Sequence, residues 1–235
     1  MLENVIGIDT DLFLWLNSYH NSYWDIFMKM VSAKFTWVVM YVIIILALWK
    51  AYGWRSMLIV AIGTMIAVAL ADQATASLLR PFFERLRPAH IDNPISPFVH
   101  IVDGSRGGAY GFPSSHAANT FATATLLSLV FRRWQFTVAI FIWAILNCYS
   151  RIYLGMHYPG DLIAGILIGF LFGLILYFIV TLINNSLRWC HHLGKRDPLL
   201  TGYIGGIRIR YRAYQLVIFF EFLTFIAILL YSFNN

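Results

Sequence analysis

The sequence predicts an all-α protein, a polytopic six-helix transmembrane bundle with short N-terminal interfacial helices. Three observations predict it: hydropathy, charge content and length. Of the 235 residues, 60% are hydrophobic and 12% are charged, and the mean hydropathy is +0.69. Soluble domains carry about 45–50% apolar and about 25% charged residues. At about 20 residues per span, the chain has room for six spans and no separate soluble domain, so we expect one membrane-embedded domain over residues 1–235.

The N-terminal region is typical of two short helices lying at the membrane interface. Residues 11–31 are apolar, but polar residues interrupt them at Asn17–Ser22, and each half is too short to cross a bilayer. The first eleven residues carry three acids and no base, which is unlike the start of a signal peptide. We therefore expect interfacial helices over residues 1–34. Four aromatic residues suited to head-group depth fall here: Trp15, Tyr19, Tyr23 and Trp24.

Six apolar segments follow, and each is expected to cross the membrane. They are Thr36–Trp49, Met57–Leu79, His116–Phe131, Phe136–Tyr149, Leu162–Ile183 and Tyr214–Phe233. Asp72 and Gln73 interrupt the second, so we expect that face to point into the bundle. In the fifth, Gly165, Gly169 and Gly173 repeat every four residues, a spacing typical of close packing between membrane helices.

Charge and cysteine content exclude two other classes of protein. The net charge of +6 comes from basic residues that flank apolar segments. We attribute it to topology and anionic lipid head groups, and we expect no nucleic-acid partner. Cys148 is expected within a span and Cys190 in a loop at the opposite membrane face, too far apart for a disulfide. The sequence does not indicate an oligomeric state.

Three polar clusters stand out from this apolar background. In chain order they are Arg80–Pro88 at the end of the second span, Pro113-Ser114-Ser115-His116 opening the third, and Ser150-Arg151 followed by His157 and Asp161 at the fifth. Counting helices places all three on the same membrane face. The long segment Ala89–Phe112 connects the first two clusters, and its length suggests a lid or a head-group contact.

The basic and hydroxyl residues of these clusters indicate phosphate binding. Arg80, Arg87 and Arg151 offer forked donors that match phosphoryl oxygens. Ser114 or Ser115 is a natural N-cap for the third span, which would leave backbone N–H groups and a positive dipole end facing an anion. Each feature alone has an ordinary explanation, as a head-group anchor or a helix cap. Their conjunction on one face predicts phosphoryl chemistry.

The histidines supply the reactive groups for such chemistry. Of His116 and His157, one can attack phosphorus as a nucleophile, and the other can protonate the leaving oxygen. Asp161 lies four residues after His157, where it can orient the imidazole and stabilise its positive charge. A metal site at His90 and His100 is disfavoured, because no cysteine or further histidine lies near them in the sequence.

In their order and spacing, the three clusters resemble the signature of the type-2 phosphatidic acid phosphatase family of membrane lipid phosphatases. That pattern is Lys-x6-Arg-Pro, then Pro-Ser-Gly-His, then Ser-Arg-x5-His-x3-Asp, and the resemblance covers residues 80–161. Two positions depart from it. Arg80 stands at the lysine position and Ser115 at the glycine position. Neither departure removes a reacting group.

The resemblance implies a role for each residue. His157 would be the nucleophile that forms a phosphohistidine, Asp161 would hold and activate it, and His116 would be the general acid. The substrate-binding residues would be Arg80, Arg87, Ser114, Ser115 and Arg151. No cofactor and no metal are expected, since arginines and a helix terminus can neutralise the transition-state charge.

The expected function is therefore that of an integral membrane phosphatase, which hydrolyses a phosphate monoester or pyrophosphate of a lipid. Four substrates remain open: undecaprenyl pyrophosphate, lipid A, phosphatidylglycerophosphate and phosphatidate. Two alternatives also remain. One is a lipid phosphotransferase that uses the same site, and the other is a non-catalytic transporter of anions or lipids.

The distribution of basic residues predicts the orientation. The face that carries the clusters has seven Lys and Arg residues, three of which we assign to the site, and the opposite face has ten. By the positive-inside rule, the opposite face is cytoplasmic. We expect a bacterial inner (plasma) membrane protein whose site faces the periplasm or exterior.

Overall fold

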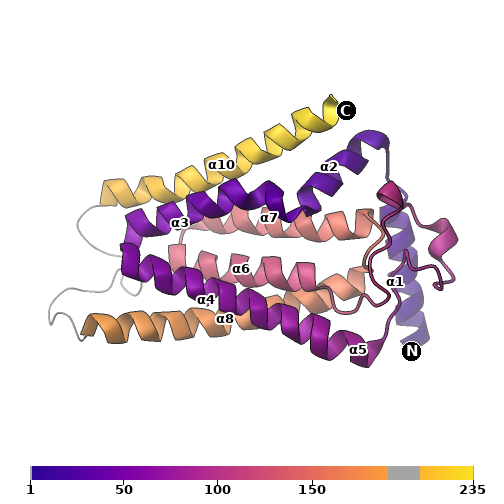
Figure 1. The fold of residues 1–235 in the computed structure, drawn as a ribbon, viewed down its shortest axis with the longest axis horizontal. Coiled ribbons are helices and arrows are strands. Elements are labelled where there is room, and N and C mark those ends of the chain that lie inside the picture. Colours follow the sequence, from indigo (N-terminus) through magenta and orange to yellow (C-terminus); the bar gives the residue numbers. More distant parts are fainter. Residues whose placement is uncertain (1, 190–206, 235) are drawn as a thin grey trace.

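The computed structural model describes residues 2–189 and 207–234, and within these residues the chain forms helices, turns and loops without a β-strand. Figure 1 shows long helices side by side along the longest axis, with a long loop and α1 (Leu2–Asn17) gathered at one end. The predicted all-α class is confirmed. Cys148 is a free, buried thiol, whereas Cys190 lies outside the described residues.

The N-terminal region forms two helices, as predicted. The first is α1, and the second is α2 (Ser22–Ser32), whose N-cap Asn21 accepts a hydrogen bond from the Trp24 N–H at 2.9 Å. The break between them falls at the predicted polar residues, although α1 starts earlier than the apolar stretch at residue 11. Figure 1 shows α1 crossing the end of the bundle, transverse to the long helices. Its placement along a membrane surface stays a prediction.

The long helices occupy the predicted positions. They are α3 (Val38–Tyr52) after a 3₁₀ turn (Lys34–Trp37), α4 (Trp54–Gln73), α6 (Ser115–Phe131), α7 (Trp134–Tyr153), α8 (Pro159–Trp189) and α10 (Ile207–Phe233). Among the described residues, five segments are long and apolar enough to cross a membrane: Lys34–Tyr52, Trp54–Phe83, Trp134–Tyr153, Pro159–Asn185 and Ala213–Phe233. The sixth expected span, α6, has 17 residues and is enclosed by its neighbours.

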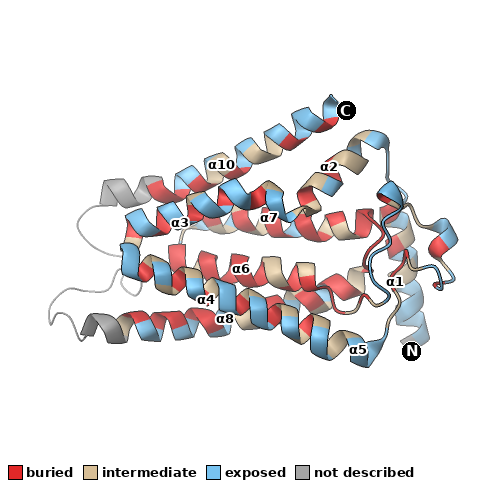
Figure 2. Ribbon diagram, viewed as in Figure 1, coloured by how far each residue is buried: buried red, intermediate tan, exposed pale blue. Residues whose placement is uncertain are grey.

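The centre of the bundle is α6, which is buried along most of its length (Figure 2). It packs against α8 along the predicted glycine stripe. A Cβ atom added at Gly165, Gly169 or Gly173 would lie 2.4, 2.5 or 2.8 Å from a backbone carbonyl oxygen of the neighbouring chain segment. Because only glycine permits this approach, the stripe fixes the N-terminus of α6 against the first turn of α8.

The polar interruption of the second span faces the bundle only in part. Asp72 accepts a hydrogen bond from Asn119 Nδ2 of α6 at 3.0 Å, as an inward-facing residue would. Gln73 is exposed and accepts a hydrogen bond from the Ser77 hydroxyl, so its predicted inward orientation is wrong. Since successive helix residues point about 100° apart, Asp72 can face α6 while Gln73 faces outward. The helix then continues through a π turn (Ala74–Leu79) into α5 (Arg80–Phe83).

The segment after α5 lies across the same end of the bundle as α1. It contains two short 3₁₀ turns, Ser96–Phe98 and Val102–Gly104. Arg106 anchors it by donating to the Ala89 carbonyl at 2.6 Å and to the Ser96 hydroxyl at 2.7 Å. Its histidines serve local contacts: the His100 ring stacks on His20 at 3.7 Å and bonds to Asp25. Within the described ranges, no group of three His, Cys, Asp or Glu residues is arranged to hold a metal.

Candidate active site

The three sequence clusters meet at the loop-rich end of the bundle. Arg80 Nη2 donates to the Ser115 hydroxyl at 2.9 Å, which joins the first cluster to the second. The Ser114 N–H donates to the Asp161 carbonyl at 3.0 Å, which joins the second to the third. The three clusters therefore meet at one end of the bundle, as predicted. They lie at the ends of α4–α5, α6 and α8.

His157 and Asp161 form a buried pair in which the Asp161 carboxylate can orient the imidazole. His157 lies in the loop that joins α7 to α8, and Asp161 lies in the first turn of α8. His157 Nδ1 is 3.4 Å from Asp161 Oδ2, and the Tyr158 N–H donates to the same oxygen at 3.0 Å. Gly155 takes φ +72° in this loop, a left-handed conformation that favours glycine and reverses the chain ahead of His157.

The surroundings of His157 favour its neutral form. Burial, followed by the positive charges of Arg87 and Arg151, holds the pKa of the imidazole well below its usual range, and a hydrogen bond to the Gly111 backbone opposes this shift. If Nδ1 carries the proton toward Asp161, then Nε2 keeps a free lone pair. That is the protonation state required of a nucleophilic imidazole.

Gly111 also lies against this pair, although no motif in the sequence assigns a role to it. A Cβ atom there would lie 3.1 Å from Asp161 Oδ2 and 3.5 Å from His157 Nδ1. A side chain would therefore crowd the His157–Asp161 contact. The only signal in the sequence is the glycine-rich composition of the long loop.

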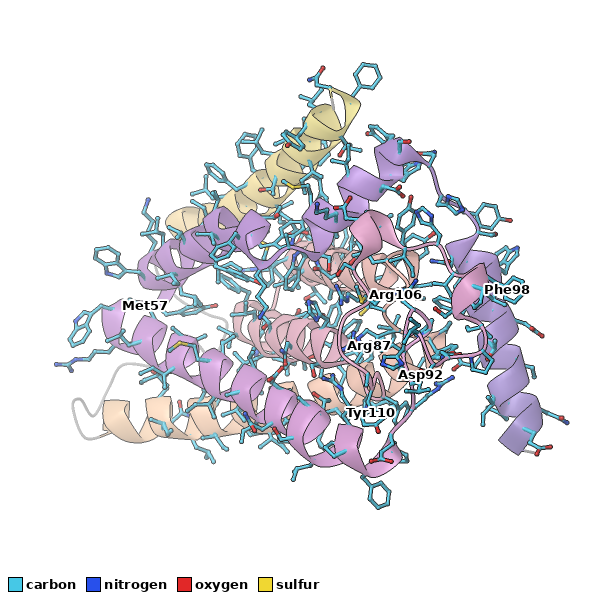
Figure 3. The ribbon with its side chains drawn as sticks, turned by 45° about the vertical axis from the view of Figure 1, so that its right-hand side comes forward. Met57, Arg87, Asp92, Phe98, Arg106 and Tyr110 are labelled. Carbon is cyan, nitrogen blue, oxygen red and sulfur yellow. The ribbon has the colours of Figure 1, made fainter. Side chains whose placement is uncertain are left out.

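Arg87 is buried beneath the loop, beside the imidazole. Its Nε donates to the Tyr110 carbonyl at 3.1 Å, and its Nη1 lies 3.8 Å from Met156 Sδ. Figure 3 shows Arg87 and Tyr110 at this loop-covered end of the molecule. Burial first, and then the like charge of Arg80, lower the pKa of Arg87 to about 10, so the guanidinium remains charged at neutral pH.

The two positions that depart from the family pattern contact each other. Ser115 opens α6 with helical geometry, and its hydroxyl receives Arg80 and lies 2.8 Å from Thr75 Oγ1 of the π turn. Serine is therefore accommodated without a left-handed backbone. Ser114 is the N-cap of α6, as predicted, and its side chain accepts the Ala117 N–H at 3.5 Å.

His116 and Arg151 each line a cavity. His116 lines a cavity of about 300 Å³, together with Asp72 and Asn119 among others, between α3, α4, α6 and α7. Arg151 lines a cavity of about 210 Å³ together with Lys29 and Met156. No hydrogen bond joins His116 to His157 in the described part of the chain.

Two arginine donors at the site are buried without a partner in the described residues. They are Arg80 Nε and Arg151 Nε. A buried donor without an acceptor carries a desolvation cost, which a ligand with several acceptor oxygens would relieve. This pair of unsatisfied donors fits the predicted binding of a phosphoryl group.

Arg85 also belongs to this site, although the sequence motifs indicate it only as a charge at the membrane face. Arg85 Nη1 donates to Asp161 Oδ1 at 2.8 Å, and Nη2 donates to Asp9 Oδ2 at 2.7 Å. Asp9 belongs to α1, 76 positions away along the chain. No pattern in the sequence links residues at that distance.

A neutral buried imidazole, an orienting carboxylate and unsatisfied arginine donors are suited to phosphoryl transfer, and here they lie at one end of a membrane-spanning bundle. These features define a membrane phosphatase. The chain belongs to the PAP2 superfamily, which it matches over residues 57–184. It is an integral membrane protein and a lipid phosphatase of the PAP2 type.

Individual relatives cover most of the chain. The "Lipid A 4'-phosphatase" of Bacteroides thetaiotaomicron is 39% identical over 232 residues, which are 99% of this chain and 98% of that protein. The "Lipid A 4'-phosphatase" of Porphyromonas gingivalis is 35% identical over 197 residues, 84% of this chain and 81% of that one. The crystal structure of Aquifex aeolicus LpxE is similar with a TM-score of 0.54 and 25% identity, over 71% of this chain and 93% of that chain.

Proposed function

We propose that this protein is a lipid A 4'-phosphatase, which hydrolyses the 4'-phosphate monoester of lipid A. One observation favours lipid A among the four lipids that the sequence left open. The similarity to a protein of that name runs over 99% of this chain, at 39% identity, and so includes helices outside the catalytic clusters. A shared phosphoryl site alone would not distinguish one lipid from another.

In the proposed mechanism, the phosphate monoester is bound first. Arg80, Arg87 and Arg151 surround it, and the buried Nε donors of Arg80 and Arg151 acquire acceptors. The capped N-terminus of α6, at Ser114 and Ser115, adds backbone N–H groups and a positive dipole end. These positive groups offset the negative charge on the equatorial oxygens in the transition state.

Covalent transfer follows. His157 Nε2 attacks phosphorus, a P–N bond forms, and the bond to the leaving oxygen of the sugar breaks. His116 gives a proton to that oxygen, so the lipid leaves as an alcohol. Asp161 accepts a hydrogen bond from His157 Nδ1 and stabilises the positive charge that develops on the ring.

Hydrolysis of the phosphohistidine completes the cycle. His116, now neutral, takes a proton from a water molecule, whose oxygen attacks phosphorus. The P–N bond breaks, inorganic phosphate leaves, and both histidines return to their starting state. We expect these steps to need no metal and no cofactor, because arginines and a helix N-terminus supply the positive charge.

We further propose that the chain is one domain over residues 1–235 in a bacterial inner membrane, with the site on the periplasmic side. The unequal distribution of basic residues supports this orientation. Lipid A in the outer leaflet would then reach the site from within the membrane.

The test is hydrolysis of defined lipids by the purified full-length protein in detergent micelles. We expect loss of one phosphate from bisphosphorylated lipid A, assigned to the 4' position by fragmentation mass spectrometry. We also expect activity to survive a chelator and to be inhibited by vanadate, which mimics the five-coordinate phosphoryl geometry.

Controls in the same assay address the remaining candidates. They use undecaprenyl pyrophosphate, phosphatidylglycerophosphate and phosphatidate as substrates, and an added acceptor lipid to detect phosphotransfer. Faster turnover of another lipid, or loss of the 1-phosphate instead, would contradict the proposed substrate. Transfer to the acceptor in place of phosphate release would make the protein a phosphotransferase.

A further inference from the structure

The Asp161 carboxylate forms its direct ion pair with Arg85, a residue outside the positions that define the family pattern. Asp161 is fully buried, and each of its oxygens is engaged. Oδ1 accepts from Arg85 Nη1 at 2.8 Å, whereas Oδ2 faces His157 Nδ1 at 3.4 Å. The buried negative charge at the candidate site is therefore balanced by Arg85 at closest range.

Arg85 is shared between two carboxylates. Its second terminal nitrogen donates to Asp9 Oδ2 at 2.7 Å, and its guanidinium carbon lies 3.9 Å from the centre of the Tyr158 ring. A guanidinium often gives both nitrogens to one carboxylate. Because Asp9 takes one of them, Asp161 receives a single hydrogen bond from Arg85 and keeps Oδ2 for the imidazole.

Asp9 is also bonded to the helix that carries Asp161. Its Oδ1 accepts the Gly160 N–H, in the first turn of α8, at 2.8 Å. A Cβ atom at Gly160 would lie 2.8 Å from Asp9 Oδ2, so glycine permits this close approach. Asp9 thus fixes both Arg85 and the backbone next to Asp161.

Other contacts hold α1 in place without Asp9. Asn17 is buried and donates to the carbonyls of Ile152 and Tyr153 at 3.1 and 2.9 Å. Phe13 is fully buried, with its ring 5.3 Å from that of Tyr158. Loss of the Asp9 carboxylate would therefore remove a charge beside Arg85 while these anchors of α1 remain.

We propose that Asp9 and Arg85 are positioning residues, which hold Asp161 in the geometry that orients His157; this inference rests on the proposed function of the same site. Arg85 is paired with two carboxylates, so it is not available to bind the phosphoryl group. The arginines of the family pattern bind that group instead. Without Asp9, Arg85 turns both nitrogens to Asp161 and draws the carboxylate from the imidazole. The superfamily match begins at residue 57, so Asp9 acts from outside it.

The experiment compares Asp9→Asn and Arg85→Ala in the full-length protein, with kcat and the inhibition constant of inorganic phosphate as readouts. We expect kcat to fall about tenfold in Asp9→Asn and about a hundredfold in Arg85→Ala, by analogy with the 10–100-fold losses found for groups that orient metal-ligating side chains. The inhibition constant stays at its wild-type value, because the phosphate-binding arginines are intact. Arg85→Lys regains part of kcat, since it restores the charge without the fork.

Two control variants show how to interpret these measurements. Asp11→Asn removes an acid from an exposed position of the same helix, and we expect wild-type kcat. Arg87→Ala raises the inhibition constant of phosphate. Wild-type kcat in both Asp9→Asn and Arg85→Ala would overturn the inference, as would an inhibition constant that rises together with the loss of kcat. Lipid hydrolysis by the wild-type protein tests the proposed function, whereas the ratio of variant to wild type tests the positioning role.

Discussion

His157 is buried among cations, and this environment sets its protonation state. Burial and the charges of Arg87 and Arg151 hold the pKa of its imidazole well below the usual range, which leaves a lone pair free. The same cations and burial would destabilise the positively charged ring of the proposed phosphohistidine. Asp161, 3.4 Å from Nδ1, lies where it would offset that charge.

Replacement of the proposed nucleophile gives the simplest test at this scale. We expect His157→Ala to reduce kcat by at least a thousandfold, because no covalent intermediate can form. The protein is expected to remain folded, as judged by its elution and thermal unfolding in detergent. Phosphate release above about a tenth of the wild-type rate would show that the nucleophile is another group.

The pH dependence of turnover follows from the sign of the His157 shift. Because its pKa is lowered, the imidazole stays neutral as the pH falls through 6.5, so protonation of the nucleophile does not reduce kcat there. Arg87 is one cause of the lowering. In Arg87→Ala at saturating substrate, we therefore expect the acid limb of the kcat profile to move to higher pH. An acid limb in the same place, or at lower pH, would contradict this assignment.

At the scale of elements, the site depends on how closely α6 approaches α8. The glycine stripe of α8 brings the α6 backbone within a distance that any side chain would increase. This contact places Ser114 against the Asp161 carbonyl, and hence the α6 N-terminus against the His157–Asp161 pair. Helix packing along the bundle therefore determines the distances between residues of the candidate site.

A matched pair of glycine substitutions separates this packing from helix propensity. In Gly169→Ala the new Cβ would lie 2.5 Å from the Ala118 carbonyl oxygen, so the helices must separate. We expect a loss of about 1–3 kcal/mol in stability, seen as a lower Tm in detergent, together with reduced kcat. Gly7→Ala in α1 meets nothing within 4 Å and is expected to keep the wild-type Tm or raise it. Equal effects of the two substitutions would disprove the packing argument.

The same elements show what the sequence could and could not predict. Apolar runs located every long helix, since hydropathy depends only on local composition. Residue spacing indicated the His157–Asp161 pair, because a carboxylate only four positions after a histidine can reach its ring. The link from Arg85 to Asp9 joins α1 to the first cluster and has no local signature. The continuation of the second span to Phe83 was also missed, because Arg80 appeared to end the apolar run.

At the scale of the whole molecule, apolar side chains face outward along the helices while polar ones gather at one end. On α8, residues such as Ile163, Leu167 and Leu171 are more than half exposed, as lipid contact requires. The polar site lies where α1 and the long loop cover the bundle (Figures 1 and 3). A reacting head group would thus meet water from that end, while its chains remain in the bilayer.

The side of the membrane that this end faces decides which lipids reach it, and cysteine labelling in intact cells tests it. Ser105 is exposed in the loop at the site end, and Gln135 is exposed at the start of α7, at the opposite end. In a background without Cys148 and Cys190, we expect a membrane-impermeant maleimide to label Ser105→Cys and not Gln135→Cys, because the basic residues concentrate at the Gln135 end. Labelling of both after permeabilisation shows that each thiol is reactive. The reverse pattern in intact cells would place the site in the cytoplasm, where outer-leaflet lipid A is not accessible, and the proposed substrate pool would be wrong.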